Sequence, residues 1–248
     1  MRWTLKPKPV TDKVDALQKA LQVDSAIATM LVQRGIETYE EAKTFFRPRL
    51  EDLHDPFLMK DMDKAVARIE KAIANKESIL VYGDYDVDGT TSVALMSSYL
   101  KTKHNLVYTY IPNRYDEGYG ISYKGINFAL ENGFSLIIAL DCGIKAIEKV
   151  AYAKKTGIDF IICDHHRPGD KIPEAAAVLD PKREDCEYPF KELCGCGVGF
   201  KLVQALASKE GKTANDLSLY LDLVATAIGA DIVPIDGENR VLAYFGLM

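Results

Sequence analysis

The stretch VYGDYDVDGTTS, residues 81–92, decides how the surrounding chain folds. It completes the apolar run ILVY, places Asp84, Asp86 and Asp88 at alternate positions, and opens the helical pattern TTSVALMSSYLKTK. An apolar run that leads directly into a helix is typical of a buried strand in an α/β sheet. Three carboxylates this close repel one another, so the pattern predicts that cations neutralise them.

The same alternation of short apolar runs and helical stretches continues beyond this point. The predicted strands are SILVYG (78–83), LVYTYIP (106–112), SLIIALDCG (135–143), DFIICDHH (159–166) and AAVLDP (176–181). Strands that are apolar throughout and joined by helices are parallel and covered on both faces. We therefore predict an α/β fold, a doubly wound and mainly parallel sheet with helices on both faces.

The chain before the first strand has a different pattern. Residues 1–75 carry apolar residues at three- and four-residue spacing and are predicted to be an N-terminal helical segment. Gly35 is expected to end a helix, and Thr38 begins the capping-box pattern TYEE. The predicted organisation is this segment followed by a catalytic α/β domain over residues 76–248.

Composition limits the class of protein. The chain has 248 residues, 48% of them hydrophobic and 27% charged, as in soluble globular proteins. No apolar run approaches the roughly 20 residues that span a bilayer, and MRWTLKPKPV has no apolar signal core. Five cysteines, an odd number, favour reduced thiols and a cytoplasmic location. The net charge of −5 argues weakly against a nucleic-acid partner unless metals or a separate basic region offset it.

Acids and imidazoles follow three of the predicted strands. Asp84, Asp86 and Asp88 follow the first, Asp141 follows SLIIAL, and Asp164, His165 and His166 follow DFIIC. Ligands of open α/β sheets bind beyond the carboxyl ends of the strands. Oxygen ligands suit Mg²⁺ or Mn²⁺, and added imidazole favours Mn²⁺. Gly89 and Thr90, at the start of the next helix, are predicted to receive a phosphate on their amide groups.

Each of these features has a simpler explanation when it is taken alone. A single DxD is usually a solvated turn, Asp141 is a possible helix N-cap, and an HH pair is more often surface or core than ligand. The coincidence of three acidic strand ends favours a metal site. The cysteines do not suggest zinc, because Cys194 and Cys196 form CGC rather than CxxC.

The chain contains neither GxSxG nor a P-loop, so the sheet offers metal ions rather than a protein nucleophile. Two divalent ions roughly 3.5–4 Å apart can activate water and stabilise the oxygens of a displacement at phosphorus. The pattern therefore indicates a metal-dependent phosphoesterase.

The motifs DYDVDG, DCG, DHH and GADIVP, in this order, resemble the DHH phosphoesterase superfamily. PNRYDEGYG, GCGVGFKL and ATAIGADIVPIDGENR resemble its RecJ branch, the 5′-to-3′ exonucleases specific for single-stranded DNA. The resemblance runs from about residue 50 to the end. It implies hydrolysis of single-stranded DNA to 5′-mononucleotides with two Mn²⁺ or Mg²⁺ ions, in DNA repair and recombination, beside helicases and single-strand-binding protein.

The resemblance also implies roles for individual residues. The ligands implied for one ion are Asp88, Asp141, His165 and Asp231, and those for the second are Asp86 and a bridging Asp141. His166 would contact the scissile phosphate, Asp164 would orient the histidines, and Arg114 would meet a nucleic-acid phosphate. Asp231 comes from the resemblance alone, because GADIVP is otherwise read as a helix end.

The sequence departs from the superfamily in two respects. Tyr82 stands where some members have a ligand histidine, and Asp84, expected on the same face of an extended segment, is the predicted substitute ligand. The DHH-associated and OB-type domains of RecJ-like proteins are not visible, which predicts a fragment of a longer enzyme. Two alternatives stay open: a DHH phosphodiesterase acting on short oligoribonucleotides or cyclic dinucleotides, and a metal-binding module that is inactive in this truncated form.

Overall fold

The structure, a computed structural model, describes residues 4–248 and divides the chain into two compact units. Residues 1–3 of the expected helical segment lie outside the described residues. One unit ends at Arg49, and the other is Leu50–Met248. We expected a boundary after residue 75, but helix α4 (Met62–Ala74) buries Val66 and Ile69 in the core of the second unit. Helical periodicity shows that α4 has an apolar face, and it does not show which unit covers that face.

The first unit is a small helical bundle. Its helices are α1 (Thr11–Leu21), α2 (Ser25–Val32) and α3 (Tyr39–Phe46). Leu17, Ala28 and Leu31 are buried in its core. The predicted capping box is confirmed: Thr38 Oγ1 accepts the Glu41 amide at 3.2 Å, and the Glu41 carboxylate accepts the Thr38 amide at 3.0 Å.

The second unit contains a five-stranded sheet in which every pair of neighbouring strands is parallel. The spatial order is β2-β1-β3-β4-β5. The strands are β1 (Ile79–Gly83), β2 (Val107–Tyr110), β3 (Leu136–Leu140), β4 (Asp159–Cys163) and β5 (Ala177–Leu179). The predicted doubly wound parallel sheet is confirmed.

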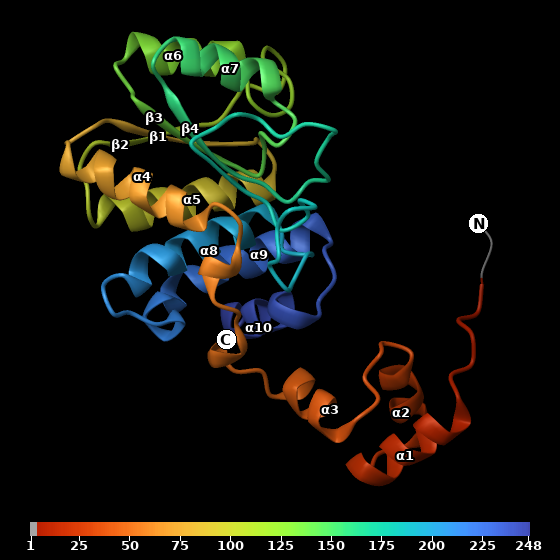
Figure 1. Cartoon of the computed structure of the whole chain (residues 1–248). Helices are drawn as coiled ribbons and strands as arrows, with labels where there is room; N and C mark the ends of the chain where they lie inside the picture. Colours follow the sequence, from red (N-terminus) through yellow and green to blue (C-terminus); the bar gives the residue numbers. More distant parts are fainter. Residues whose placement is uncertain (1–3) are drawn as a thin grey trace. The chain divides into compact units, whose positions relative to one another are not determined.

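Helices cover both faces of this sheet, and Figure 1 shows α6 and α7 on one face and α4 and α5 on the other. The helices after β1 are α5 (Val87–Lys101), α6 (Tyr123–Glu131), α7 (Ile147–Lys155), α8 (Gly195–Ser208), α9 (Leu221–Asp231) and α10 (Gly237–Gly246). Short 3-10 helices η1 (Leu50–Asp52), η2 (Pro56–Leu58) and η3 (Ala214–Tyr220) complete the unit. Alternate strand residues enter two separate cores, since Leu80 and Tyr82 pack on the α6–α7 side while Ile79 and Val81 pack with α4, α5 and α8.

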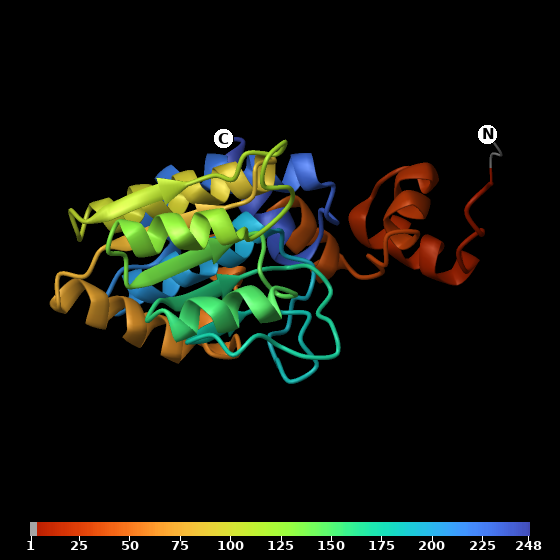
Figure 2. The same cartoon turned by 90° about the horizontal axis from the view of Figure 1, so that it is seen from above.

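The strand register places several chain segments at one edge. Gly83 pairs with Leu140, Leu140 with Cys163, and Cys163 with Leu179, so the last residues of four strands lie level. In Figure 2 the strands lie side by side beneath α6, and the segment 164–194 (teal) gathers at one end of them. Within residues 4–248, no helix combines the length and the apolar character needed to cross a bilayer.

Candidate metal centre

Residues from four elements meet around the imidazole of His165. Its Nε2 lies 3.2 Å from Asp141 Oδ1, 3.6 Å from Asp231 Oδ2 and 3.8 Å from Asp88 Oδ2. Neither His165 nitrogen, nor Asp141 Oδ1, has a hydrogen-bond partner among the described residues, although all three atoms are buried. Buried polar atoms without partners are rare, and lone pairs that converge without hydrogen bonds are typical of a shared cation. This cluster of Asp88, Asp141, His165 and Asp231 is called the aspartate–histidine cluster below.

Asp88 is fixed by the helix that faces it. Its Oδ2 accepts the Gly195 amide and its Oδ1 accepts the Cys196 amide, both at 2.6 Å. Gly195 and Cys196 open α8, where amide groups have no partner within the helix and the dipole favours a negative charge. The Asp88 carboxylate therefore accepts hydrogen bonds from the first two amides of α8, and its remaining lone pairs are available on the side of His165.

Asp141 occupies a constrained position between β3 and α8. Its amide donates to the Cys163 carbonyl at 2.8 Å, and its φ of 59° lies in the left-handed region. A Cβ at Gly195 would lie 2.6 Å from Asp141 Oδ1, so only glycine permits this approach. Asp141 is not a helix N-cap, because α7 begins at Ile147 behind Ala146.

Asp231 is the last residue of α9 and the most exposed member of the cluster, with 32% of its side chain accessible. Ile232 follows with φ 58°, which ends the helix at this point. Sequence spacing could not reveal this residue, and only the resemblance pointed to it. The structure brings it to the cluster through the packing of α9 against α5 and α8.

The cluster is electrostatically unfavourable without a cation. Burial raises the pKa of Asp88 to about 7, and the neighbouring Asp231 and Asp86 carboxylates contribute to the rise. Burial, followed by the charge of Asp88, also raises the pKa of Asp141. Burial lowers the pKa of His165, which keeps its imidazole neutral with a lone pair available to a metal. Carboxylate oxygens with one neutral imidazole suit Mn²⁺ or Mg²⁺.

Asp164 does not face this cluster and instead holds the second histidine. Its Oδ1 accepts the amides of His165 and His166 at 2.8 and 3.1 Å and lies 2.7 Å from His166 Nδ1. Its Oδ2 accepts the Ile144 amide at 2.9 Å. Burial alone would raise the pKa of Asp164, but the hydrogen bonds from His166 and the backbone keep it below the usual value. The carboxylate is therefore ionised, His166 Nδ1 donates to it, and His166 Nε2 points away from Asp164.

The three aspartates of the opening stretch do not share a face, which corrects the expectation of an extended segment. The strand ends at Gly83, and α5 begins at Val87 with Asp86 as its N-cap. Asp86 Oδ1 accepts the Gly89 amide at 2.9 Å, and the residue is exposed. Asp84 is buried, and its Oδ2 has no partner within the described residues. Among residues 4–248, neither Asp84 nor Asp86 belongs to the two groups of side chains placed to share an ion.

Those two groups are Asp88 with His165 and Asp231, and Asp141 with His165 and His166. His165 belongs to both, so the two groups lie against each other. The structure therefore brings together five of the site residues predicted from the sequence, in two neighbouring groups that could each hold an ion.

Tyr82 is buried in the core on the α6–α7 side of the sheet. Its hydroxyl donates to the Gly120 carbonyl at 2.9 Å and accepts the Ser122 amide at 3.1 Å, and its ring stacks on Tyr110. Tyr82 therefore holds the loop after β2. Glu117 holds the same loop, because its carboxylate accepts the Asn113 amide at 2.8 Å and the Tyr110 hydroxyl at 2.9 Å. Neither role was predicted from the sequence, in which the EGYG run was the available signal.

This loop carries the predicted phosphate-binding arginine. Arg114 is exposed, and its guanidinium lies 4.6 Å from the centre of the Tyr85 ring. Tyr85 contacts Tyr119 edge-on at 6.1 Å between centroids, and the Tyr119 hydroxyl lies 3.1 Å from His166 Nε2. Arg114 and His166 are thus connected by two aromatic side chains.

Gly89 and Thr90 have a structural explanation. The Gly89 amide donates to Asp86 Oδ1, and the Thr90 amide donates to the Asp86 carbonyl at 2.9 Å. A Cβ at Gly89 would lie 2.4 Å from the Asp84 carbonyl oxygen, so glycine is required for the approach of α5 to the strand end. The prediction that these two amides receive a phosphate finds no support in this geometry.

The cysteines are buried, and several of them pack close to the acids. All five are free and buried, and burial raises the pKa of Cys142, Cys163, Cys194 and Cys196. Cys194 Sγ accepts the Gly197 amide and caps α8.

Comparison with protein families matches residues 78–228 to the family described as "DHH family, N-terminal domain". A relative from Bacillus subtilis (strain 168), described as "Single-stranded-DNA-specific exonuclease RecJ", is 44% identical over 247 residues, which is 100% of this chain and 30% of the relative. A relative with the same description from Salmonella typhimurium is 39% identical over 197 residues, 75% of this chain and 34% of the relative. The chain thus spans about a third of the length of these relatives.

Two solved structures are also similar. The structure of RecJ in complex with Mn²⁺ from Thermus thermophilus superposes with a TM-score of 0.81 at 28% identity, over 99% of this chain and 34% of that one. A structure of exonuclease RecJ bound to manganese has a TM-score of 0.69 at 34% identity, over 76% of this chain and 48% of that one.

Proposed function

Because this chain belongs to the DHH family, we propose that it is the catalytic part of a metal-dependent exonuclease. It hydrolyses single-stranded DNA from the 5′ end and releases 5′-mononucleotides. The observation that carries the proposal is the aspartate–histidine cluster, where the unpartnered Asp141 Oδ1 and His165 Nε2 lie 3.2 Å apart. The substrate comes from the relatives, which are described as exonucleases specific for single-stranded DNA.

The metals are Mn²⁺ or Mg²⁺. Similar structures were solved with manganese and with magnesium. Asp88, Asp141, His165 and Asp231 would hold one ion. For a second ion the resemblance implies Asp141 and Asp86, although Asp86 caps α5 and lies outside the two groups of side chains placed to share an ion. The buried and unpartnered Oδ2 of Asp84 is a further carboxylate oxygen that could serve it. Bound divalent ions supply an activated water for attack on phosphorus and compensate the charge of the leaving oxygen.

The remaining residues position the phosphate. His166 keeps its proton on Nδ1 toward Asp164, and its Nε2 faces the phosphate that is cleaved. The Ile144 amide holds the Asp164 carboxylate in place, and that carboxylate accepts the proton of His166 Nδ1. The imidazole is therefore oriented before the substrate arrives. Arg114 binds a backbone phosphate from its exposed position over Tyr85.

The wider setting of this activity also rests on the resemblance. It is DNA repair and recombination in the cytoplasm, beside a helicase and single-strand-binding protein. One structural observation supports contact with a nucleic acid despite the net charge of −5: the exposed Arg114 loop offers the cation that the phosphate contact requires.

The test is a nuclease assay of the purified chain with Mn²⁺. The substrates are a 5′-phosphorylated single strand, the same strand in a blunt duplex, and a dinucleotide. We expect mononucleotides from the single strand, much slower release from the duplex, and loss of both with EDTA or in His165→Ala. The matched control is Lys155→Ala, an exposed residue of α7.

Three outcomes contradict the proposal. Hydrolysis that persists in EDTA or in His165→Ala excludes the cluster as its source. Preference for the dinucleotide identifies a phosphodiesterase of short substrates. Calorimetric Mn²⁺ binding without any hydrolysis identifies a metal-binding module that does not turn over.

A further inference from the structure

Two chain segments beside the aspartate–histidine cluster are joined to each other by one buried side chain. Asn239 lies in the first turn of α10 and is fully buried. Its Nδ2 donates to the Glu192 carbonyl at 2.6 Å and to the Pro234 carbonyl at 3.0 Å. Both partners are carbonyl groups, which only accept hydrogen bonds, so the nitrogen of the side-chain amide must face them.

Each of these carbonyls lies close in sequence to one side of the cluster. Glu192 lies three residues before the start of α8, whose first amides hold Asp88. Pro234 lies three residues after Asp231, which ends α9. Figure 1 shows α8, α9 and α10 grouped on the same side of the sheet. Asn239 therefore links the segment that holds Asp88 to the loop that follows Asp231.

The loop after Asp231 begins in a strained conformation. Ile232 has a φ of 58°, in the left-handed region, where a β-branched side chain is a steric outlier. Strained backbone persists only where the surrounding structure determines it. The side chains of Ile232 and Ile235 are 88% and 52% exposed, so burial of these side chains does little to hold the loop.

A close packing contact joins the same two segments. Gly237, the first residue of α10, has a φ of 44°, and a Cβ at this position would lie 2.6 Å from Phe190 Cε2. Phe190 and Val233 are partly buried against the core. Packing against Phe190 and the hydrogen bonds of Asn239 therefore hold the loop at the same place.

We propose that Asn239 is a positioning residue for the metal centre. It holds the loop after Asp231 in its strained form, so that the Asp231 carboxylate faces His165 before an ion arrives. The inference rests on the proposed function, because it takes Asp231 as a ligand of the ion. Removal of a group that orients a metal ligand typically weakens metal binding about 10- to 100-fold. Without Asn239 the loop relaxes, and binding of the ion must then restore the strain of Ile232.

Calorimetric titration of the full chain with Mn²⁺, in the absence of DNA, tests the inference. Asn239→Ala should raise the Kd for Mn²⁺ about 10- to 100-fold, and Asp231→Asn, the reference for a lost ligand, should raise it at least as much. Tyr188→Phe is the control for lost stability, because the buried Tyr188 hydroxyl donates to Glu238, the neighbour of Asn239 in α10. It should lower the metal-free melting temperature and leave the Kd unchanged. An equal rise in the Kd of Asn239→Ala and Tyr188→Phe would attribute the effect to stability and overturn the inference.

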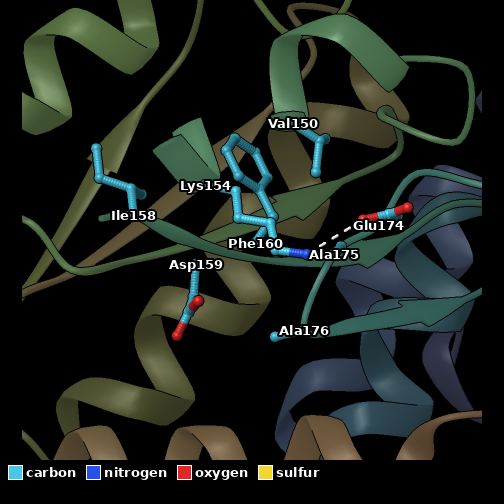
Figure 3. A pocket seen from close by; sticks show the side chains of 8 residues that line it. All are labelled: Val150, Lys154, Ile158, Asp159, Phe160, Glu174, Ala175 and Ala176. Atoms are coloured by element: carbon cyan, nitrogen blue, oxygen red, sulfur yellow. Dashed lines mark hydrogen bonds and ion pairs between the residues drawn. The ribbon is translucent and has the colours of Figure 1, made fainter. Parts of the chain in front are cut away.

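A hollow at the opposite end of the sheet provides a second control. Figure 3 shows it lined by Val150, Lys154, Phe160 and Glu174, and its volume is about 140 Å³. Lys154 Nζ lies 3.2 Å from Glu174 Oε2. Asp159, the first residue of β4, also lines the hollow, which therefore lies at the other end of that strand from His165. Lys154→Ala, which removes a polar contact remote from the cluster, should leave the Kd for Mn²⁺ unchanged.

A second substitution tests the role of strain. Ile232→Asn replaces an exposed side chain by one that tolerates the left-handed backbone. In the parent chain it should change the Kd for Mn²⁺ little, because the loop is already held. In Asn239→Ala it should recover roughly tenfold in affinity, because the relaxed loop then reaches its bound form without strain. This non-additivity distinguishes positioning from a general loss of packing.

Gly237→Ala keeps the test decisive if Asn239→Ala fails to fold. The added methyl group presses on Phe190 at the same junction and should also weaken Mn²⁺ binding. A Kd that matches the parent in both variants, beside a raised Kd in Asp231→Asn, overturns the inference and leaves the proposed function intact, and additive effects of Asn239→Ala and Ile232→Asn overturn it as well. An Asp231→Asn chain that binds Mn²⁺ as tightly as the parent overturns the ligand assignment of the proposed function, and this inference with it.

Discussion

His166 Nδ1 lies 2.7 Å from Asp164 Oδ1, while Oδ2 of the same carboxylate is held by the Ile144 amide. The hydrogen bond to Asp164 raises the pKa of His166. The carboxylate therefore sets both the direction in which the imidazole points and the pH range in which it carries a proton.

Asp164→Asn should separate this positioning role from metal binding. The variant keeps the shape of the side chain but removes the charge, so we expect the pKa of His166 to fall and kcat to fall about 10- to 100-fold. The imidazole resonances in an NMR titration report the pKa, and steady-state hydrolysis of a single strand reports kcat. Glu174→Gln, at the distant hollow, should change neither. An unchanged His166 titration in Asp164→Asn would contradict the assignment.

Asp141→Asn should have opposite effects on the metal-free and Mn²⁺-loaded protein. Asparagine tolerates the left-handed backbone of residue 141, where φ is 59°. Burial and the neighbouring carboxylates raise the pKa of Asp141, so its charge costs stability at neutral pH without metal, and this cost fades as the pH falls. The metal-free variant should therefore melt at the same temperature as the parent or higher.

Loading with Mn²⁺ reverses this comparison. Saturation at 100 times Kd stabilises a protein by about 2.7 kcal/mol, and we expect the parent to show such a rise in melting temperature while Asp141→Asn shows little. Differential scanning calorimetry with and without Mn²⁺ measures both. A variant that is stabilised by Mn²⁺ as strongly as the parent would show that Asp141 is not a ligand.

Glu77 should make folding sensitive to acid at the other end of the sheet. Burial alone would raise its pKa, but hydrogen bonds from Ser135, Arg68 and Asn75 lower it to about 2 from the ordinary 4.5. Because the folded-state pKa is depressed, the stabilisation is fully present above about pH 4.5 and is lost as the pH falls toward 2. Glu77→Gln should lower the free energy of unfolding by about 1 kcal/mol at pH 7.

Urea titrations of the parent and Glu77→Gln between pH 2 and 7, within the range in which both fold, measure this difference. The gap should narrow as the pH falls below about 4.5. Asp63→Asn, an exposed change in the first turn of α4, is the matched control. A gap that does not vary with pH would mean that packing, and not the charge of Glu77, provides the stability.

The fold and part of the site follow from the sequence because both depend on local pattern. Apolar runs between helices predict parallel strands, and parallel strands bring Asp141 and His165 to one edge whatever the detailed packing is. The prediction that Asp84, Asp86 and Asp88 share a face was wrong, because side chains alternate between two faces only within a strand and β1 ends at Gly83. Asp86 caps α5 instead, and Asp88 lies inside the first turn of the helix.

Other parts of the site depend on contacts that no local pattern contains. Asp231 reaches His165 only because α9 packs against α5 and α8, and Asp88 is held by amides that lie more than a hundred residues away in the chain. The boundary between the two units depends in the same way on which surface covers α4. Tertiary packing decides these positions, and a single sequence does not show it.

Tyr82→Phe should test whether the loop after β2 is held by a hydroxyl group rather than by a metal. The variant keeps the stack on Tyr110 and removes the hydrogen bonds to Gly120 and Ser122, so we expect a loss of about 1–2 kcal/mol in the free energy of unfolding. KM for single-stranded DNA should rise several-fold, because Arg114 and Tyr119 lie on this loop, while Mn²⁺ affinity stays unchanged. Tyr108→Phe, whose residue is 49% exposed, is the control. Weaker Mn²⁺ binding in Tyr82→Phe would place the hydroxyl among the ligands and contradict this account.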